Sequence, residues 1–328
     1  MLFVTNRFPS GSLSIRTEIG REFTFDLSNT APSNSVFFCE RSGSGAYTEQ
    51  GNKQFFQKLK DSKYKQILLY CHGFNTLPEE AFSTANDMQK LFDMSAKNEI
   101  LVVPLVWPCD NADDNNQIIV TEYWNDHKSA EMSALSFARV FDKFLNWQST
   151  SSENDPENPC FKRINMLTHS LGAKVLRGTL DAWNQNDLPR GVPMIFRNVF
   201  LVAADIVNEA LEKGQLGQYI SHSARNVVVY HASDDLALRA SKALNLKYGI
   251  ASRRLGHSGP EDMSKVPKNI YAVDCDDVNT KYNSPFGHAY FTYDQSKTKP
   301  GLVFEHILAC LKTGRVATDA GQDKILII

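Results

Sequence analysis

The stretch that decides the fold is residues 163–178, R-I-N-M-L-T-H-S-L-G-A-K-V-L-R-G. The apolar run at residues 164–167 is typical of a buried strand, and the apolar residues that follow recur at helical spacing. Ser170 lies between the two patterns, where a nucleophilic serine needs small residues two positions before and after it. Gly172 meets this requirement, whereas Thr168 departs from it. The motif alone therefore fits either a nucleophile turn or an ordinary strand-to-helix turn.

Strand and helix patterns alternate along most of the chain. We expect buried strands at residues 66–71, 100–107, 163–167, 198–203, 226–231 and 269–273. Helical patterns are expected at residues 54–59, 79–93, 128–147, 208–213, 236–244 and 301–312. Short apolar strands separated by helices are typical of a parallel sheet with helices on both faces. The sequence therefore predicts an α/β fold with a mostly parallel central sheet.

The first part of the chain has a different pattern. Short β-like pieces at residues 2–5, 13–17, 22–27 and 35–39 are separated by glycine and proline. We expect an N-terminal β-rich extension over residues 1–50 and one α/β domain over residues 51–328. Within that domain, an irregular acidic loop is expected at residues 109–116 and a polar linker at residues 148–158.

Composition excludes several classes of protein. Hydrophobic content of 42% and charged content of 22% are ordinary for a soluble globular chain. The 35 basic and 37 acidic residues give a net charge of -2 without a basic stripe, so no nucleic-acid partner is expected. The six scattered cysteines form no C-x-x-C, and the sequence has no metal, Walker or dinucleotide motif, so no metal or cofactor is expected. Without a secretory signal or a run of about 18 apolar residues, we expect a cytoplasmic protein with no membrane span.

A second motif, Y-C-H-G-F-N-T at residues 70–76, directly follows an expected strand. Gly73 allows the chain to turn so that the backbone N–H of Phe74 points into a cleft. Acyl-transfer enzymes need two such N–H groups to bind the oxyanion of the tetrahedral intermediate, and Leu171 would supply the other. The alternative is that Gly73 only supports a tight turn and His72 is a core histidine.

Acid and base candidates follow Ser170 in the chain. Asp235 lies after an expected strand, and His288 lies in a loop after the last expected strand of the sheet. The order Ser, Asp, His is the one typical of α/β-hydrolases. His288 would act as general base, and Asp235 would orient its ring.

Other carboxylates remain open as the acid. Asp205 also follows a strand, and Asp234 could replace Asp235 if the latter caps the next helix. Among the histidines, His169 is expected to point away from Ser170, and His288 is the best base.

Four aromatic residues are candidates for an apolar substrate pocket, with core or rim packing as the alternative: Trp107, Tyr123, Trp124 and Phe286. The segment at residues 109–126 lies where a cap is often found in such folds. Its acidic side chains would disfavour strongly anionic substrates near the mouth of the pocket.

Taken together, these motifs resemble a bacterial α/β-hydrolase family of unknown function. The matching pieces are F-V-T-N-R at residues 3–7, H-G-F-N-T at 72–76, V-W-P at 106–108, T-H-S-L-G at 168–172, A-S-D-D-L-A-L at 232–238 and G-H-A-Y-F at 287–291. The resemblance implies an α/β-hydrolase fold and a triad of Ser170, Asp235 and His288. It favours Asp235 over Asp234, because the acid of the family stands two residues before an Ala-Leu pair.

Two functions follow from this reading. The first is a cofactor-independent serine hydrolase that cleaves carboxylic esters, with thioesters or amides as alternatives, through an acyl-Ser170 intermediate. Its partner would be a small ester or acyl substrate. The second is a hydrolase fold that serves as a binding or scaffolding module without catalysis.

Overall fold

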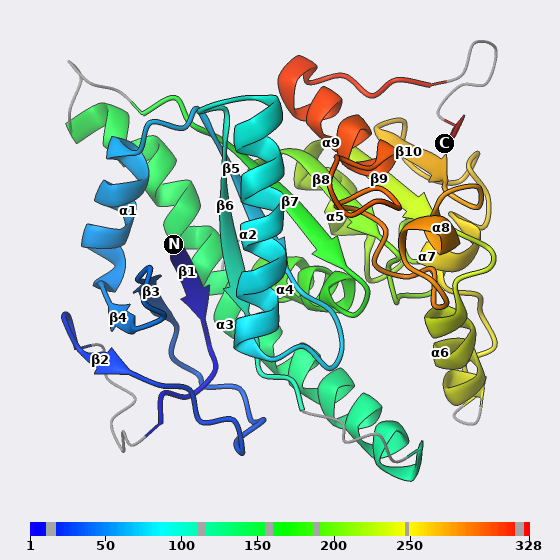
Figure 1. Cartoon of the computed structure of the whole chain (residues 1–328), viewed down its shortest axis with the longest axis horizontal. Helices are drawn as coiled ribbons and strands as arrows, with labels where there is room; N and C mark the ends of the chain where they lie inside the picture. Colours follow the sequence, from blue (N-terminus) through cyan, green and yellow to red (C-terminus); the bar gives the residue numbers. More distant parts are fainter. Residues whose placement is uncertain (11–17, 111–115, 155–159, 187–190, 247–248, 319–324) are drawn as a thin grey trace.

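The computed structural model describes residues 1–10, 18–110, 116–154, 160–186, 191–246, 249–318 and 325–328. These residues form an 11-stranded sheet (Figure 1). Its parallel part comprises, in spatial order, β11 (Ile325–Ile327), β10 (Ile270–Asp274), β9 (Ala224–His231), β8 (Phe196–Val202), β7 (Arg163–His169), β5 (Gln66–Cys71), β6 (Ile100–Val106) and β1 (Leu2–Thr5). The sheet continues in antiparallel pairing through β3 (Phe37–Arg41), β4 (Tyr47–Glu49) and β2 (Glu22–Phe23).

The N-terminal strands therefore extend the same sheet. β1 pairs in parallel with β6 on one side and antiparallel with β3 on the other. The buried guanidinium of Arg7, just after β1, donates to the carbonyl of Cys109 at 2.7 Å and to that of Leu27 at 2.8 Å. The F-V-T-N-R motif thus ties the N-terminal segment to the chain beyond β6. The division at residue 50 stays a prediction.

Helices cover both faces of the sheet, as predicted. Alternate side chains of β5 enter two different cores: Ile67 packs in one, and Leu68 in the other. The first core is closed by α1 (Gly51–Asp61), α3 (Asn116–Asn154) and α4 (Gly172–Asn186), the second by α2 (Pro78–Ser95) and α9 (Leu302–Thr313). Shorter helices between β8 and α9 are α5 (Gln218–His222), α6 (Leu236–Leu246), α7 (Leu255–Ser258) and α8 (Asn279–Tyr282).

Three expectations about single elements need correction. Residues 208–213, expected to be helical, form consecutive turns. α3 begins at Asn116 and continues to Asn154, so residues 148–154 are helix where a linker was expected. Thr150 supports this extension by donating to the carbonyl of Asn146 at 2.6 Å. β2 is shorter than the strand expected at residues 22–27. The strand expected at residues 13–17 and most of the acidic loop lie outside the described residues.

A ladder of buried amides crosses the centre of the sheet. Asn226 donates to Asn198 at 2.8 Å, Asn198 donates to Asn165 at 2.8 Å, and Asn165 donates to Gln66 at 3.2 Å. All four side chains are buried within otherwise apolar strands. Because a buried amide without its partner is costly, the ladder fixes the register of β5, β7, β8 and β9.

We expect the substitution Asn198→Ala to lower the free energy of unfolding by about 1–3 kcal/mol, because the buried side-chain oxygen of Asn165 loses its donor and the amide of Asn226 loses one of its two acceptors. Urea denaturation would measure the loss. The exposed Asn146→Ala on α3 is the matched control, expected within about 0.5 kcal/mol of the wild type. Equal stabilities of the two variants would contradict the role of the ladder.

Candidate active site

Ser170 stands on a strained turn between β7 and α4. Its φ angle of 52° lies in the left-handed region, which side-chain-bearing residues rarely adopt. The backbone N–H of Ser170 donates to the carbonyl of Val202 at 3.0 Å, and its own carbonyl accepts the N–H of Asp205 at 3.0 Å. β8 and the residues after it therefore hold the turn on both sides. This is the conformation expected of a nucleophile elbow.

Two glycines make room for the turn. A Cβ atom on Gly172 would lie 2.6 Å from the carbonyl oxygens of both Cys71 and His72. A Cβ atom on Gly73 would lie 2.9 Å from the Cβ of Ser170. The contacts at Gly172 are with backbone, which cannot move aside as a flexible side chain can. Glycine at position 172 is therefore a steric requirement of the turn.

Thr168 does not prevent the turn. It is buried within β7, in register with Cys71 of β5 and Leu201 of β8. The backbone leaves the strand only after His169, so the tight approach falls on Gly172 rather than on Thr168.

Two backbone N–H groups beside the turn have no internal acceptor. Across the described part of the chain, neither the N–H of Leu171 nor that of Phe74 donates a hydrogen bond. Leu171 is fully buried immediately before α4, and Phe74 lines the same cavity as Ser170. Buried N–H groups are nearly always paired, so the unpaired N–H of the buried Leu171 is unusual, and that of the half-buried Phe74 is unpaired as well.

His72 and Trp107 shape the loop that carries Phe74. Their rings stack with planes 6° apart and centroids 5.2 Å apart, and the Trp107 indole donates to the carbonyl of His72 at 2.9 Å. Burial lowers the pKa of His72 to about 4, so its ring is neutral. His72 is a core histidine, and Trp107 packs here instead of lining the cavity at Ser170. The expectation for Trp107 is corrected accordingly.

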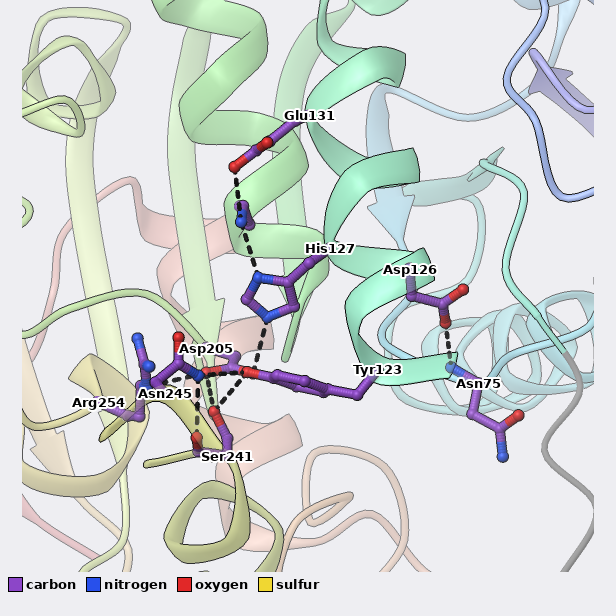
Figure 2. A network of polar contacts seen from close by, with 10 residues as sticks. Asn75, Tyr123, Asp126, His127, Glu131, Asp205, Ser241, Asn245 and Arg254 are labelled. Carbon is purple, nitrogen blue, oxygen red and sulfur yellow. Dashed lines mark hydrogen bonds and ion pairs between the residues drawn. The ribbon is translucent and has the colours of Figure 1, made fainter. Parts of the chain in front are cut away.

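Asp126 of α3 fastens the same loop from the other side. Its carboxylate accepts the backbone N–H of Asn75 at 3.0 Å (Figure 2). It also accepts the backbone N–H of Asp110 at 2.7 Å. The side chain is fully buried. Asp126 therefore anchors the loop and does not lie at the mouth of the pocket, which corrects the expectation for this one acid of the segment; Asp113 and Asp114 lie outside the described residues.

The structure brings His288 and Asp235 together. The Nδ1 atom of His288 lies 2.7 Å from the carboxylate of Asp235, which is fully buried. With the Nδ1 hydrogen donated to Asp235, the Nε2 atom is free to accept a proton. The other oxygen of Asp235 accepts the N–H of Leu238 at 2.9 Å, so one carboxylate both caps α6 and orients His288.

The other two acid candidates bond to groups other than His288. Asp234 accepts a hydrogen bond from Asn279, and Asp205 belongs to a separate buried network. Within the described residues, no hydrogen bond joins the Ser170 hydroxyl to His288. Such bonds are often long in ligand-free enzymes and tighten when substrate binds.

His169 supports His288 from behind. Its Nε2 donates to the backbone carbonyl of His288 at 3.2 Å, and the two ring centroids are 4.7 Å apart. Burial, followed by the nearness of His288, places the pKa of His169 well below its ordinary value, so the ring stays neutral. His169 borders the cavity of Ser170, whereas the sequence suggested that it points away.

Ser170, His169 and His288 border one cavity of about 330 Å³. Ser170, His288 and Phe74 line it, with one wall provided by α6. Of the predicted pocket aromatics, Tyr123 and Phe286 line the cavity. Trp124 does not belong to the lining and packs against Tyr123, with ring centroids 5.5 Å apart. The expectation for Trp124 is therefore also corrected.

The sequence did not reveal the network behind this cavity. Figure 2 shows Tyr123 reaching from α3 to Asp205, beside Ser241 of α6. Asp205 accepts from Ser241 at 2.6 Å and from Tyr123 at 3.0 Å, and its carboxylate lies 3.3 Å from Arg254. These residues are far apart in the chain and share no local motif, so only the position of Asp205 after a strand could have pointed to the network.

The family of the chain follows from comparison with known sequences. Residues 48–299 match the model of a family described as alpha/beta hydrolase of unknown function (DUF900). The chain belongs to this family. The resemblance inferred from the motifs is thus confirmed, as is the fold class.

Solved structures of related shape are distant from this member of the family. Phospholipase PlaB from Legionella pneumophila shares 15% identity at a TM-score of 0.27, over 69% of this chain and 41% of the phospholipase. The chain thus spans well under two thirds of that protein. A cutinase-like protein from Cryptococcus sp. shares 13% identity at a TM-score of 0.28, over 78% of this chain and 98% of its own. No curated protein matches the sequence.

Two further observations concern the described residues only. None of their helices is both long and apolar enough to span a membrane. No group of three or more His, Cys, Asp or Glu side chains among them is arranged to hold a metal ion.

We expect Gly172→Ala to lower the free energy of unfolding by about 1–3 kcal/mol, because its methyl group would overlap two backbone carbonyls. Thermal or urea unfolding measures this loss. Gly43→Ala is the matched control, since a Cβ atom there meets nothing within 4 Å. A Gly172→Ala protein as stable as this control would show that the turn is not sterically constrained.

The buried Asp126 predicts a pH dependence of stability. Burial raises the pKa of Asp126 to about 7, so between about pH 4 and this value the folded chain holds a proton that the unfolded chain has lost. The contribution of Asp126 to the free energy of unfolding therefore falls as the pH rises through this window. In Asp126→Asn, unfolding measured across the window should show a smaller fall than in the exposed Asp61→Asn control. Equal slopes would contradict this account.

Proposed function

We propose that this α/β-hydrolase family member is a serine hydrolase that cleaves carboxylic esters through an acyl-Ser170 intermediate. The observation that carries the proposal is the hydrogen bond between the buried Asp235 and His288, whose ring lines the same cavity as a serine on a left-handed turn. This arrangement supports the assignment of Ser170 as nucleophile, His288 as base and Asp235 as orienting acid. Thioesters and amides react by the same steps and form the wider substrate class.

In the first half of the reaction, the Ser170 oxygen attacks the acyl carbonyl carbon. The Nε2 atom of His288 takes the hydroxyl proton, while Asp235 holds Nδ1 and stabilises the imidazolium. The carbonyl oxygen becomes an oxyanion, for which the unpaired N–H groups of Leu171 and Phe74 are suitable donors. His288 then gives its proton to the leaving alkoxide, and the C–O bond breaks.

In the second half of the reaction, a water molecule takes the place of the Ser170 hydroxyl as the nucleophile. His288 takes a proton from the water, and the hydroxide attacks the acyl carbon. The oxyanion collapses, the Ser170 ester bond breaks, and His288 returns the proton to the serine oxygen. The carboxylic acid leaves, and no cofactor enters the balance.

Activity-based labelling tests this proposal. A fluorophosphonate probe should label the wild-type protein at Ser170, as shown by peptide mass spectrometry. Labelling should be lost in Ser170→Ala and fall at least about 100-fold in His288→Ala, because the serine is then not deprotonated. The exposed Ser44→Ala is the control, expected to label like the wild type.

A folded wild-type protein that is not labelled, or is labelled elsewhere, would sink the proposal. That outcome would favour the alternative of a hydrolase fold used for binding or scaffolding. Circular dichroism and thermal unfolding of each variant would separate loss of reactivity from loss of fold.

A further inference from the structure

The cavity at Ser170 has an apolar mouth and a polar floor. Phe286 and Leu236 are 58% and 43% exposed, whereas Asp205 and Ser241 are only 3% and 4% exposed. All four line the same cavity, so the order of exposure runs from its mouth to its floor. A group that enters past the apolar rim therefore reaches Asp205 and Ser241 beside the apolar Leu238, which is 1% exposed.

The hydroxyl groups of Ser241 and Tyr123, on the floor, donate their hydrogens to protein atoms and not to a molecule bound in the cavity. Ser241 donates to one oxygen of Asp205 at 2.6 Å, and the single hydrogen of the Tyr123 hydroxyl goes either to the other oxygen at 3.0 Å or to the Ser241 oxygen at 2.8 Å. Asn245 supplies a further hydrogen to the Tyr123 oxygen at 2.8 Å. Because each hydroxyl has one hydrogen, both side chains present only lone pairs to the cavity. The floor accepts hydrogen bonds and offers none.

The positive charges of this region lie behind the floor. Arg254 forms an ion pair with Asp205 at 3.3 Å, but it is not one of the described residues that line the cavity. Lys174 lies 2.7 Å from Nδ1 of His127, so the hydrogen of that ring is on Nε2, directed at Asp205 from 4.0 Å (Figure 2). The cationic Arg254 thus meets Asp205 from outside the cavity, and the atoms nearest to an occupant are oxygen acceptors.

The geometry also indicates which part of the substrate reaches the floor. The leaving group must lie beside His288, which protonates it and whose side chain is 16% exposed, next to the open rim. The acyl chain, bound to Ser170, is left with the buried side of the cavity toward Ser241.

We propose that this cavity selects an uncharged acyl chain that carries a hydroxyl group, which donates a hydrogen bond to the oxygens of Ser241 and Tyr123. The assignment rests on the proposed ester hydrolysis and adds the substrate class to it. A carboxylate-ended chain would meet lone pairs and Asp205 with no donor to bind it, so it is disfavoured.

The test uses three ethyl esters of equal chain length, whose chains end in methyl, hydroxyl or carboxylate. Two sets, one based on butanoate and one on hexanoate, cover two depths of the cavity. For at least one set, kcat/KM of the wild-type protein should be about tenfold higher for the hydroxyl-ended ester than for the methyl-ended one, and lowest for the carboxylate-ended ester.

Substitutions at the floor test whether its side chains cause the preference for the hydroxyl-ended ester. The ratio of hydroxyl-ended to methyl-ended kcat/KM should fall toward one in Ser241→Ala and in Tyr123→Phe. Leu244→Val, a change of size without polarity on the same wall, is the matched control and should keep the ratio. The two floor variants are independent, so failure of one to fold leaves the other to decide.

The outcomes distinguish the two proposals. Ester cleavage without a hydroxyl preference at either length, or with a preference that both floor variants retain, would overturn the substrate assignment alone. Efficient cleavage of the carboxylate-ended ester would do the same. If no ester is cleaved and Ser170 is not labelled, ester hydrolysis fails and the assignment fails with it.

Discussion

The left-handed backbone at Ser170 is the constraint on which the rest of the site depends. Such a conformation costs a side-chain-bearing residue about 1–3 kcal/mol and persists only when its surroundings fix it. Here two backbone hydrogen bonds to β8 and the following residues hold the turn, and Gly172 packs against two carbonyl oxygens to which a Cβ atom would come within 2.6 Å. The same turn leaves the Leu171 N–H unpaired beside the serine. The strain at Ser170, the close contact at Gly172 and the unpaired N–H of Leu171 are thus consequences of one backbone conformation.

The parallel sheet explains how distant segments meet at this turn. The chain leaves β5 toward Phe74, β7 toward Ser170, β8 toward Asp205 and β9 toward Asp235, all at the carboxyl edge, where open α/β sheets bind their ligands. His288 enters from a loop beyond β10. Asp235 links fold and site most directly, since it caps α6 and contacts His288 with the same carboxylate. The helix that forms one wall of the cavity is therefore tied to the group proposed to orient the base.

The sequence predicted those features that have a local signature. The apolar run before Ser170 predicted the strand, and the close approach of neighbouring residues in the turn explains the glycine after it. The alternation of strands and helices predicted the fold class, which the structure and the family match confirm. Features built from remote contacts were not predictable. Whether Trp107 packs on His72 or lines a cavity depends on how two strand ends meet, and the link from Asp205 to Ser241 has no sequence pattern. The helical start of α3 was missed because its polar residues, including Asp126, bond inward to a loop that the sequence does not place.

The most direct test of acyl transfer to Ser170 is pre-steady-state kinetics with a p-nitrophenyl ester, combined with mass spectrometry of the quenched protein. The account predicts a rapid release of nitrophenol equal to the enzyme concentration whenever deacylation is the slower step. It also predicts an acyl adduct on the peptide that contains Ser170, at a level set by the relative rates of the two steps. Turnover by a folded Ser170→Ala protein at the wild-type rate, or an adduct found only on another residue, would contradict the account.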